Sequence, residues 1–305
     1  MGGKVKSKTV LVTGGAGFIG SHLVDKLVER GYQVRVIDDL SLGKRGNINP
    51  RANFCSEDIK KLKQIKPVFE GVDCVFHLAA RPRIQPSIIN PDESFTNNLL
   101  GTHNVLVAAK KAGVKKFIYS GSSSVYGDQS VSPLAETLDP RPKNPYALHK
   151  LMSEQLCRQF TDLYNFPTVC LRYFNVYGER QPTEGAYATV VGIFLQQKAS
   201  SHSLTVVGDG TQRRDFTHVS DVVEANILAM ESAEAVGQII NIGTGKNYSI
   251  NEVAGLMDCS WIYISFRPGE VQETLADISK ARKILGFRPT MSLKVWIQQQ
   301  LKKMV

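Results

Sequence analysis

The sequence predicts an α/β fold in which a doubly wound parallel sheet is joined to a smaller mixed α/β lobe. Three observations lead to this prediction. A short apolar run, a glycine-rich turn and an amphipathic helix follow one another at the start of the chain. Short apolar runs then alternate with helical patterns as far as residue 176, which favours parallel strands joined by helices. Beyond that residue the alternation breaks down, as expected where a second lobe begins.

The first strand, turn and helix form one unit. Val10–Val12 is the continuous apolar run of a strand that is buried on both faces. The turn Gly14–Gly20 carries glycine at every third position, and Ser21–Arg30 places its apolar residues on one helical stripe. Such glycines let the backbone approach a pyrophosphate closely at a helix N-terminus. The unit therefore predicts dinucleotide binding; the alternative is an ordinary turn that opens a helix.

The second strand supports the dinucleotide interpretation. Gln33–Ile37 reads as a strand that ends at Asp38 and Asp39. These acids follow the glycines by about 20 residues, where a carboxylate can bind a ribose 2′-hydroxyl. We therefore expect a Rossmann sheet.

The remaining elements define two predicted lobes. Residues 1–176, with return segments at about 216–242, are expected to form the dinucleotide-binding domain, and residues 177–215 and 243–305 the substrate-binding lobe. Further strands are predicted at Asn53–Cys55, Cys74–Leu78, Phe117–Ser120, Thr168–Arg172, Leu204–Val207 and Gln238–Asn241. Helices are predicted at Lys60–Glu70, Asp92–Gly113, Asn144–Asn165, Gly185–Gln197, Ser220–Met230, Ser279–Leu285 and Leu293–Lys303.

Composition argues against several classes of protein. The chain is 42% hydrophobic and 21% charged, and no apolar run is long enough to span a bilayer. The N-terminus carries no apolar leader, so we expect a cytoplasmic protein without a membrane partner. The net charge of +9 comes from scattered Lys and Arg, which favours attraction of an anionic metabolite over nucleic-acid binding. The five cysteines are widely spaced, so no metal site is expected.

A serine, a tyrosine and a lysine suggest catalysis. Ser122 follows the fifth predicted strand, and Tyr146 and Lys150 share one face of a later helix because they lie four residues apart. A nearby ammonium lowers the tyrosine pKa of about 10 by roughly 1–3 units. Such a tyrosine can accept a proton from a sugar hydroxyl while hydride leaves the same carbon. The alternative is a surface pair on a helix, and we interpret His77 and His218 as structural histidines.

These motifs together resemble the extended short-chain dehydrogenase/reductases and, within them, the NAD-dependent nucleotide-sugar 4-epimerases. The resemblance covers nearly the whole chain. It rests on T-G-G-A-G-F-I-G, D-D-L, D-I, H-L-A-A, N-N-L-L-G-T, S-S-S-V-Y-G, Y-A-L-H-K, R-Y-F-N-V-Y-G, G-D-G-T-Q-R-R-D-F and R-P-G-E.

The resemblance implies NAD as cofactor and a UDP-sugar as substrate, with Tyr146, Lys150 and Ser122 catalytic. It implies cofactor contacts from Gly14, Gly17, Phe18, Ile19, Gly20, Asp38, Asp39, Asp58, Ile59, Ala79, Ala80, Asn98, Ser120, Tyr146, Lys150 and Tyr173. It implies substrate contacts from Arg83, Ser87, Ser122, Ser123, Asn175, Val206, Arg214, Arg267, Glu270 and Thr274. Arg214 and Arg267 correspond to the diphosphate-binding arginines, and Glu270 to the acid on the uridine ribose.

The resemblance also bears on the reaction. Relatives that dehydrate or decarboxylate the sugar carry an acid just before V-Y-G, where this chain has Ser123-Ser124. Simple 4-epimerisation is therefore favoured. A bulky tyrosine that narrows the family's sugar pocket corresponds here to Thr274, and Arg81–Ser87 resembles the sugar-facing loop of the N-acetyl-active group. Both features favour UDP-GlcNAc and UDP-GalNAc, with UDP-Glc and UDP-Gal as further candidates.

Other interpretations stay open. The chain could be a nucleotide-sugar 4,6-dehydratase or reductase of the same superfamily, or a non-catalytic NAD-binding relative. Asn251–Phe266 is shorter than the family's corresponding segment, through a trimmed lobe edge or missing residues. The resemblance also implies a homodimer formed by helices Asp92–Gly113 and Asn144–Asn165. Candidate side chains for that interface, which could equally lie in the core, are Leu99, Val105, Leu106 and Leu156.

Overall fold

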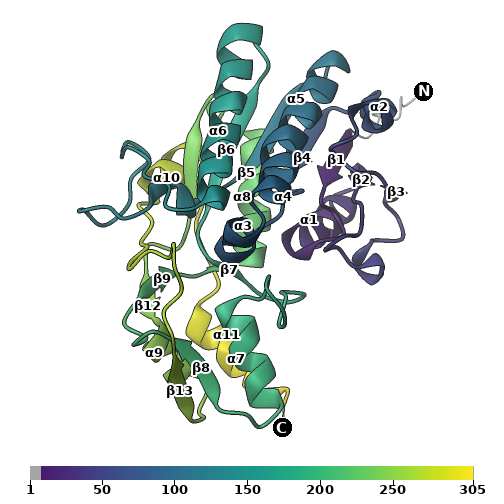
Figure 1. Cartoon of the computed structure of the whole chain (residues 1–305). Helices are drawn as coiled ribbons and strands as arrows, with labels where there is room; N and C mark the ends of the chain where they lie inside the picture. Colours follow the sequence, from purple (N-terminus) through teal and green to yellow (C-terminus); the bar gives the residue numbers. More distant parts are fainter. Residues whose placement is uncertain (1–7, 305) are drawn as a thin grey trace.

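The computed structural model describes residues 8–304. The N-terminal segment 1–7, on which the expectation about a leader depends, lies outside the described residues. A seven-stranded parallel sheet forms the larger part of the molecule, in the order β11-β6-β5-β4-β1-β2-β3 (Figure 1). Its strands are β1 (Thr9–Thr13), β2 (Gln33–Ile37), β3 (Asn53–Cys55), β4 (Cys74–His77), β5 (Lys116–Ser122), β6 (Thr168–Tyr173) and β11 (Ile239–Ile242). This arrangement confirms the predicted doubly wound fold.

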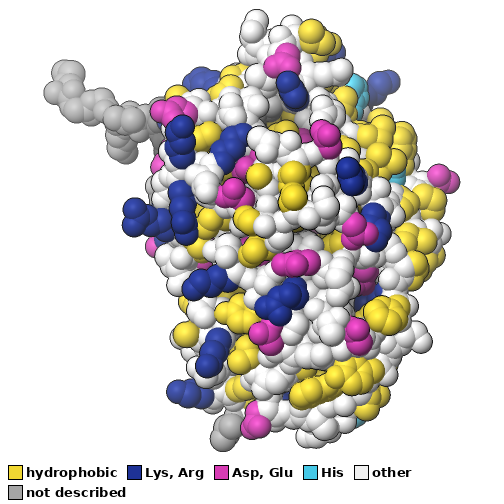
Figure 2. Space-filling model, turned by 90° about the vertical axis from the view of Figure 1, so that its left-hand side faces the viewer, with side chains coloured by type: hydrophobic (Ala, Val, Ile, Leu, Met, Phe, Trp, Pro, Cys, Tyr) yellow, Lys and Arg dark blue, Asp and Glu magenta, His cyan; other side chains and the backbone are white. Residues whose placement is uncertain are grey.

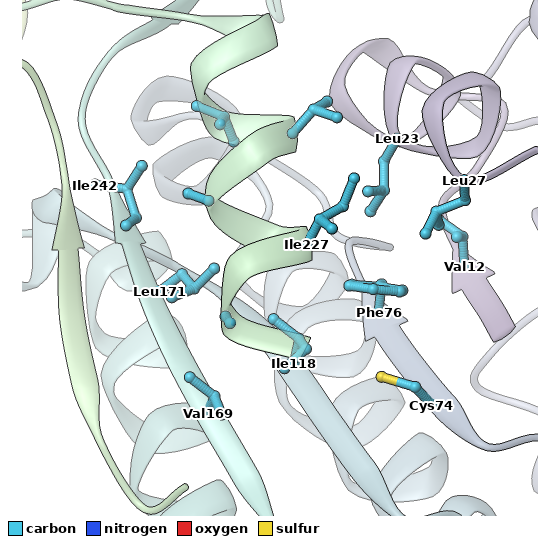
Figure 3. Close-up of a cluster of buried hydrophobic side chains, with 14 of the residues drawn as sticks. Val12, Leu23, Leu27, Cys74, Phe76, Ile118, Val169, Leu171, Ile227 and Ile242 are labelled. Atoms are coloured by element: carbon cyan, nitrogen blue, oxygen red, sulfur yellow. The ribbon is translucent and has the colours of Figure 1, made fainter. Parts of the chain in front are cut away.

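Helices cover both faces of the sheet. On one face, α1 (Phe18–Glu29) and α8 (Val219–Glu231) pack Leu23, Leu27 and Ile227 against strand residues such as Phe76 (Figure 3). On the other face, apolar residues of α2 (Leu62–Ile65), α5 (Gly101–Lys111) and α6 (Pro145–Tyr164) form a second core. Because both faces are covered, the central strands β1 and β4 are buried along their whole length and show no polar alternation, whereas β2, nearer the edge, alternates polar and apolar residues.

Two predicted helices are interrupted in the structure. Pro67 lacks an amide hydrogen, and the helix predicted at Lys60–Glu70 is only α2 followed by the 3₁₀ turn η2 (Lys66–Phe69). The helix predicted at Asp92–Gly113 comprises α4 (Pro91–Phe95), the π turn η3 (Thr96–Leu100) and α5. A short helix that the sequence analysis missed, α3 (Ile84–Ile89), precedes α4. Further 3₁₀ turns are η1 (Arg45–Asn47) and η4 (Ser123–Tyr126).

The smaller lobe lies below the large sheet in Figure 1 and has its own apolar core, which includes Phe194, Val206 and Trp296. Three two-stranded pairs join its segments to one another and to the larger part. They are β7 (Val176–Tyr177) with β10 (Thr217–His218), β9 (Arg213–Asp215) with β12 (Asn247–Ser249), and β8 (Leu204–Val207) with β13 (Trp261–Ile264). Its helices are α7 (Val190–Ala199), α9 (Ile250–Gly255) and α11 (Leu293–Lys302).

Two predicted helix starts and one lobe assignment differ from the structure. α7 begins after Thr189 rather than at Gly185, because the Thr189 hydroxyl accepts the Gly192 amide hydrogen and caps the helix. α8 is capped by the His218 ring, not by Ser220 and Asp221. α10 (Ser279–Leu285), which we assigned to the smaller lobe, packs with β11 in the core of the large sheet.

Candidate active site

A cavity of about 770 Å³ lies between the carboxyl ends of the large sheet's strands and the smaller lobe. It collects residues that are far apart in the sequence. The predicted site residues that line it are Gly14, Gly17, Phe18, Ile19, Gly20, Asp38, Asp39, Ile59, Ala79, Ala80, Arg83, Ser120, Ser122, Ser123, Tyr146, Lys150, Tyr173, Asn175, Arg214, Arg267, Glu270 and Thr274. Ligands bind at this edge of open α/β sheets, so the cavity is the candidate active site.

The glycine turn leaves no room for side chains. Gly14 has a φ of +73°, and a Cβ there would lie 2.7 Å from the Ala79 nitrogen. A Cβ at Gly20 would lie 2.1 Å from the Gly14 oxygen. Glycine at both positions therefore lets the backbone fold back on itself at the N-terminus of α1, where free amides and the helix dipole attract phosphate.

Asp38 is held in place by the same turn. Its carboxylate accepts hydrogen bonds from the amides of Ala16 at 2.9 Å and Leu40 at 2.9 Å. Burial raises the pKa of Asp38, while these two hydrogen bonds act in the opposite direction. The carboxylate thus lies fixed at the end of β2, beside the glycine turn, as a ribose ligand requires. The glycine turn and Asp38 together fit NAD, which would supply the hydride acceptor when bound.

Ser122, Tyr146 and Lys150 meet at the centre of the cavity. Ser122 ends β5 and its Oγ accepts a hydrogen bond from the Ser124 hydroxyl at 2.9 Å, which leaves its own proton free to donate. Tyr146 lies in the first turn of α6, because Asn144 caps that helix through the Ala147 amide. Lys150, one turn later, donates from Nζ to the Ser120 carbonyl oxygen at 2.7 Å.

Burial controls the protonation of these groups. It raises the pKa of Tyr146, while a hydrogen bond with Ser122 and the positive charge of Arg83 lower it. Burial lowers the pKa of Lys150 to about 8. Tyr173 also lines the cavity, and its hydroxyl is fixed by Ser120 at 3.0 Å and Asn226 at 2.9 Å.

Charged residues line the other end of the cavity. Arg214 Nη2 lies 3.7 Å from Glu270 Oε2, and burial lowers the pKa of Arg214. Arg267 is exposed beside them. Two arginine side chains next to a carboxylate can hold a diphosphate together with a ribose.

Four predicted site residues do not line the cavity. Val206 is buried in the core of the smaller lobe, and strand alternation turns its neighbours Thr205 and Val207 toward the cavity instead. Asp58 accepts the Lys60 amide hydrogen bond at 2.8 Å, and its neighbour Ile59 lines the cavity.

The other two of these residues hold the cavity walls. The Asn98 side chain bonds both the nitrogen of Arg81 at 2.7 Å and its oxygen at 3.0 Å, which fixes the loop after β4. Ser87 is buried, and its Oγ accepts the Tyr146 amide hydrogen bond at 3.0 Å. Both residues therefore support the backbone around the cavity through contacts between segments far apart in the sequence.

Several residues that line the cavity were not predicted from the sequence. Tyr187 and Arg180 come from the segment before α7 and belong to no motif that we identified. Gln212, in the turn before β9, lies within the G-D-G-T-Q-R-R-D-F motif but was not predicted as a site residue. Asn47, within the glycine-containing loop Ser41–Pro50 after β2, was not predicted either. Among residues 8–304 there is no cluster of His, Cys, Asp or Glu that could hold a metal ion, and no helix long and apolar enough to cross a bilayer.

Comparison with known proteins places this geometry in a family. Residues 10–243 match the model of the NAD dependent epimerase/dehydratase family. A UDP-glucose 4-epimerase from Thermotoga maritima, solved with UDP-glucose, is similar with a TM-score of 0.93 and 38% identity over 96% of this chain and 97% of its own. A UDP-N-acetylglucosamine 4-epimerase from Methanobrevibacter ruminantium, in complex with UDP-N-acetylmuramic acid, has a TM-score of 0.92 and 35% identity over 98% of both chains.

A third similar structure contains the cofactor. It is a UDP-glucuronic acid 4-epimerase from Bacillus cereus in complex with UDP-glucuronic acid and NAD, with a TM-score of 0.89 and 35% identity over 97% of this chain and 98% of its own. The extent of these matches, together with the glycine turn, Asp38 and the Ser122, Tyr146 and Lys150 group, shows that this chain belongs to the NAD-dependent epimerase/dehydratase family, and that NAD is its cofactor.

Proposed function

We propose that the protein catalyses reversible 4-epimerisation of a UDP-sugar, with UDP-GlcNAc and UDP-GalNAc as its preferred pair. The observation that carries this proposal is the meeting of Ser122, Tyr146 and Lys150 in a cavity that also contains the glycine turn. The names of three similar structures, each a UDP-sugar 4-epimerase, support the reaction type. Ser123 and Ser124, at the position where dehydratases and decarboxylases carry an acid, favour epimerisation over elimination.

Each residue has a distinct task in this proposal. Tyr146 accepts the proton of the sugar 4-hydroxyl and later returns it, while Ser122 donates a hydrogen bond to the same oxygen. Lys150, anchored on Ser120, adds positive charge beside them. When bound at the glycine turn and Asp38, NAD would supply the acceptor for the hydride from C4. Asn175 and Thr274 border the space in which the oxidised sugar can turn. The Nδ2 atom of Asn175 donates a hydrogen bond to Thr274 Oγ1 at 3.2 Å.

The small side chain at Thr274 supports the N-acetyl preference. It lines the cavity, and its Oγ1 accepts hydrogen bonds from Asn175 and, at 3.4 Å, from the Asp215 amide. A threonine here leaves volume that a tyrosine ring would fill. We propose that this volume accommodates an acetamido group.

The experiment is to incubate the purified protein with UDP-GlcNAc and to follow the anomeric protons by NMR, first without added NAD and then with it. We expect UDP-GalNAc to form. Tyr146→Phe should lower the rate by roughly 100-fold or more, since general acid–base catalysis contributes 10²–10⁴-fold. Release of water or net consumption of NADH would instead indicate a dehydratase or reductase, and the proposed reaction would be wrong.

Substrate preference is tested by Thr274→Tyr, with Thr274→Ser as the matched control. We expect Thr274→Tyr to lower kcat/KM for UDP-GlcNAc by about 100-fold while UDP-glucose loses much less, since overpacking a pocket excludes the larger ligand. Thr274→Ser keeps the hydroxyl and removes only one methyl group, so it should retain both activities. Equal losses on both substrates, or a wild type that converts only UDP-glucose, would contradict the preference and leave the epimerase proposal standing.

A further inference from the structure

Arg81 connects two distant segments at the edge of the cavity. Its Nε donates to Glu93 Oε1 on α4 at 2.7 Å, and its Nη1 donates to Ser41 Oγ, in the loop after β2, at 2.6 Å. Ser41 and Arg81 both line the cavity, although they lie 40 residues apart in the sequence. The planar guanidinium makes both hydrogen bonds at once, so one side chain joins α4 to the loop after β2.

The backbone of Arg81 is held firmly in place. The Asn98 side chain accepts the hydrogen bond of the Arg81 amide at 2.7 Å and donates to the Arg81 carbonyl oxygen at 3.0 Å. Asn98 is buried, and its own carbonyl oxygen accepts hydrogen bonds from the hydroxyls of Thr102 and Ser153. The Arg81 side chain, which is only 15% exposed, therefore extends from a rigid support.

The loop after β2 directs Ser41 toward Arg81. The Asp39 carboxylate accepts hydrogen bonds from both the amide and the hydroxyl of Ser41. The one hydroxyl hydrogen of Ser41 is thus used, and its oxygen lone pairs remain for the Arg81 donor. Leu40, between Asp39 and Ser41, has a φ of +58°, a left-handed conformation that is rare for a bulky side chain. Such strain persists where the surrounding contacts require it.

The strand order places the hydrogen bond between Arg81 and Ser41 across the glycine turn. β1 lies between β2 and β4 in the sheet. Because Ser41 follows β2 and Arg81 follows β4, their bond spans two strand spacings, roughly 9–10 Å, over the turn Gly14–Gly20 that follows β1. The bond is exposed to solvent, whereas Gly14 and Gly17 are partly buried. A dinucleotide bound at the glycine turn would therefore have this bond on its solvent side.

We propose that the hydrogen bond between Arg81 and Ser41 is a latch that closes the adenosine end of the cofactor groove and slows the release of NAD. The adenosine end is concerned because Asp38, the predicted ribose ligand, lies three residues before Ser41 in the same loop. NAD leaves after the latch opens, and the ion pair with Glu93 keeps the guanidinium in position to close it again. This inference concerns the cofactor and does not depend on which sugar is converted.

The first test measures release of the cofactor in the absence of any UDP-sugar. Protein loaded with radiolabelled NAD is mixed with an excess of unlabelled NAD, and the label that stays bound is followed over time by rapid filtration. In Ser41→Ala, which keeps the Glu93 ion pair, we expect release about 10-fold faster than in the wild type, because a hydrogen bond to a charged group is lost. An unchanged rate of release in Ser41→Ala would overturn the proposal.

Variants of Arg81 separate the latch from a simple effect of charge. Arg81→Gln removes both hydrogen bonds of the guanidinium and should release NAD at least as fast as Ser41→Ala. Arg81→Lys keeps the charge but lacks the planar fork that bonds Glu93 and Ser41 together, so its release should also be faster than that of the wild type. Release at the wild-type rate in Arg81→Lys would show that positive charge alone retains the cofactor, and the latch would be wrong.

Two controls test whether the effect belongs to this pair of residues. Arg51→Gln removes an equal charge at an exposed position outside the cavity and should release NAD at the wild-type rate. The double variant of Ser41→Ala and Arg81→Gln should release NAD no faster than Arg81→Gln alone, because both substitutions break the same bond. Faster release in Arg51→Gln, or multiplied effects in the double variant, would contradict the latch. The Tm of the cofactor-free protein should be unchanged in Ser41→Ala; a lower Tm would attribute faster release to a loss of structure and overturn the proposal.

Discussion

At the scale of single residues, His77 shows how a histidine in the core is kept neutral. Its Nε2 lies 2.9 Å from the Thr102 hydroxyl, which itself donates to the Asn98 oxygen, so Nε2 carries the proton. The Thr13 hydroxyl, 2.7 Å from Nδ1, then donates to it. Burial lowers the pKa of His77 from 6.5 to about 3. The structural interpretation of this histidine is confirmed, and His218, the cap of α8, is likewise structural.

The neutral histidine predicts a dependence of stability on pH. The unfolded chain binds a proton on His77 below pH 6.5, whereas the folded protein excludes it until about pH 3. The stabilisation is therefore present above pH 6.5 and is lost as the pH falls toward 3. As the pH falls from 7 to 5, we expect protonation of His77 in the unfolded chain to lower the free energy of unfolding by about 2 kcal/mol.

Urea titrations of the wild type and His77→Gln at both pH values measure this effect. The variant should be less stable at pH 7, because a buried hydrogen-bonded ring is lost, but its stability should fall less between the two pH values. Parallel losses in the two proteins would show that His77 does not titrate in this window.

At the scale of elements, no amide hydrogen in the first turn of α6 lacks an acceptor. Pro145 has no amide hydrogen, Ser87 accepts the one of Tyr146 and Asn144 accepts the one of Ala147. Such complete capping fixes the start of the helix and thereby the Tyr146 side chain. The cap also links α3 to α6, since Ser87 belongs to α3.

Ser87→Ala tests that link. The substitution leaves the Tyr146 amide buried without an acceptor, which should cost about 1–3 kcal/mol of stability. We expect a lower Tm and a lower kcat with little change in KM, because Ser87 does not line the cavity. Ser87→Thr retains the hydroxyl and is the control for the loss of the hydrogen bond. If Ser87→Ala raised KM alone, Ser87 would be a substrate ligand after all.

At the scale of the whole molecule, one surface carries several exposed apolar side chains. Ile89 is 82% exposed, Phe95 45%, Leu148 44% and Met152 40%, and these residues lie on α3, α4 and α6. Figure 2 shows, on the face that it presents, hydrophobic side chains gathered near one edge and charges of both signs mixed over the rest. The residues suggested from the sequence lie deeper: Val105 and Leu106 are fully buried, and Leu99 and Leu156 partly so.

We propose that this surface forms a homodimer through α4 and α6. Light scattering after size-exclusion chromatography should give twice the chain mass of 33.7 kDa for the wild type. Leu148→Glu should give the monomer, because a charge in an apolar interface is left unpaired. Val295→Glu, at a 47% exposed position on α11 in the smaller lobe, should remain dimeric. A monomeric wild type, or dissociation by both substitutions, would contradict the proposed interface.

The sequence by itself determined the strands of the large sheet, most of the longer helices, the glycine turn and the group Ser122, Tyr146 and Lys150. These depend on local spacing: apolar runs, glycines at every third position and an interval of four on one helix. A side-chain cap can override the apolar pattern at the start of a helix. At Thr189 such a cap makes α7 begin later than the apolar pattern indicated.

Only the tertiary structure decided which residues support the site. Ser87 meets Tyr146 across 59 residues, and Arg172 Nε bonds the buried Glu154 carboxylate at 2.9 Å across 18 residues. The place of α10 against β11 likewise depends on packing between segments far apart in the sequence. Such contacts depend on how distant elements pack, and a single sequence carries no local signal for that. Arg83 combines both levels, because its residue type is visible in the sequence while its left-handed backbone and its hydrogen bond to the Tyr187 oxygen exist only in the folded chain.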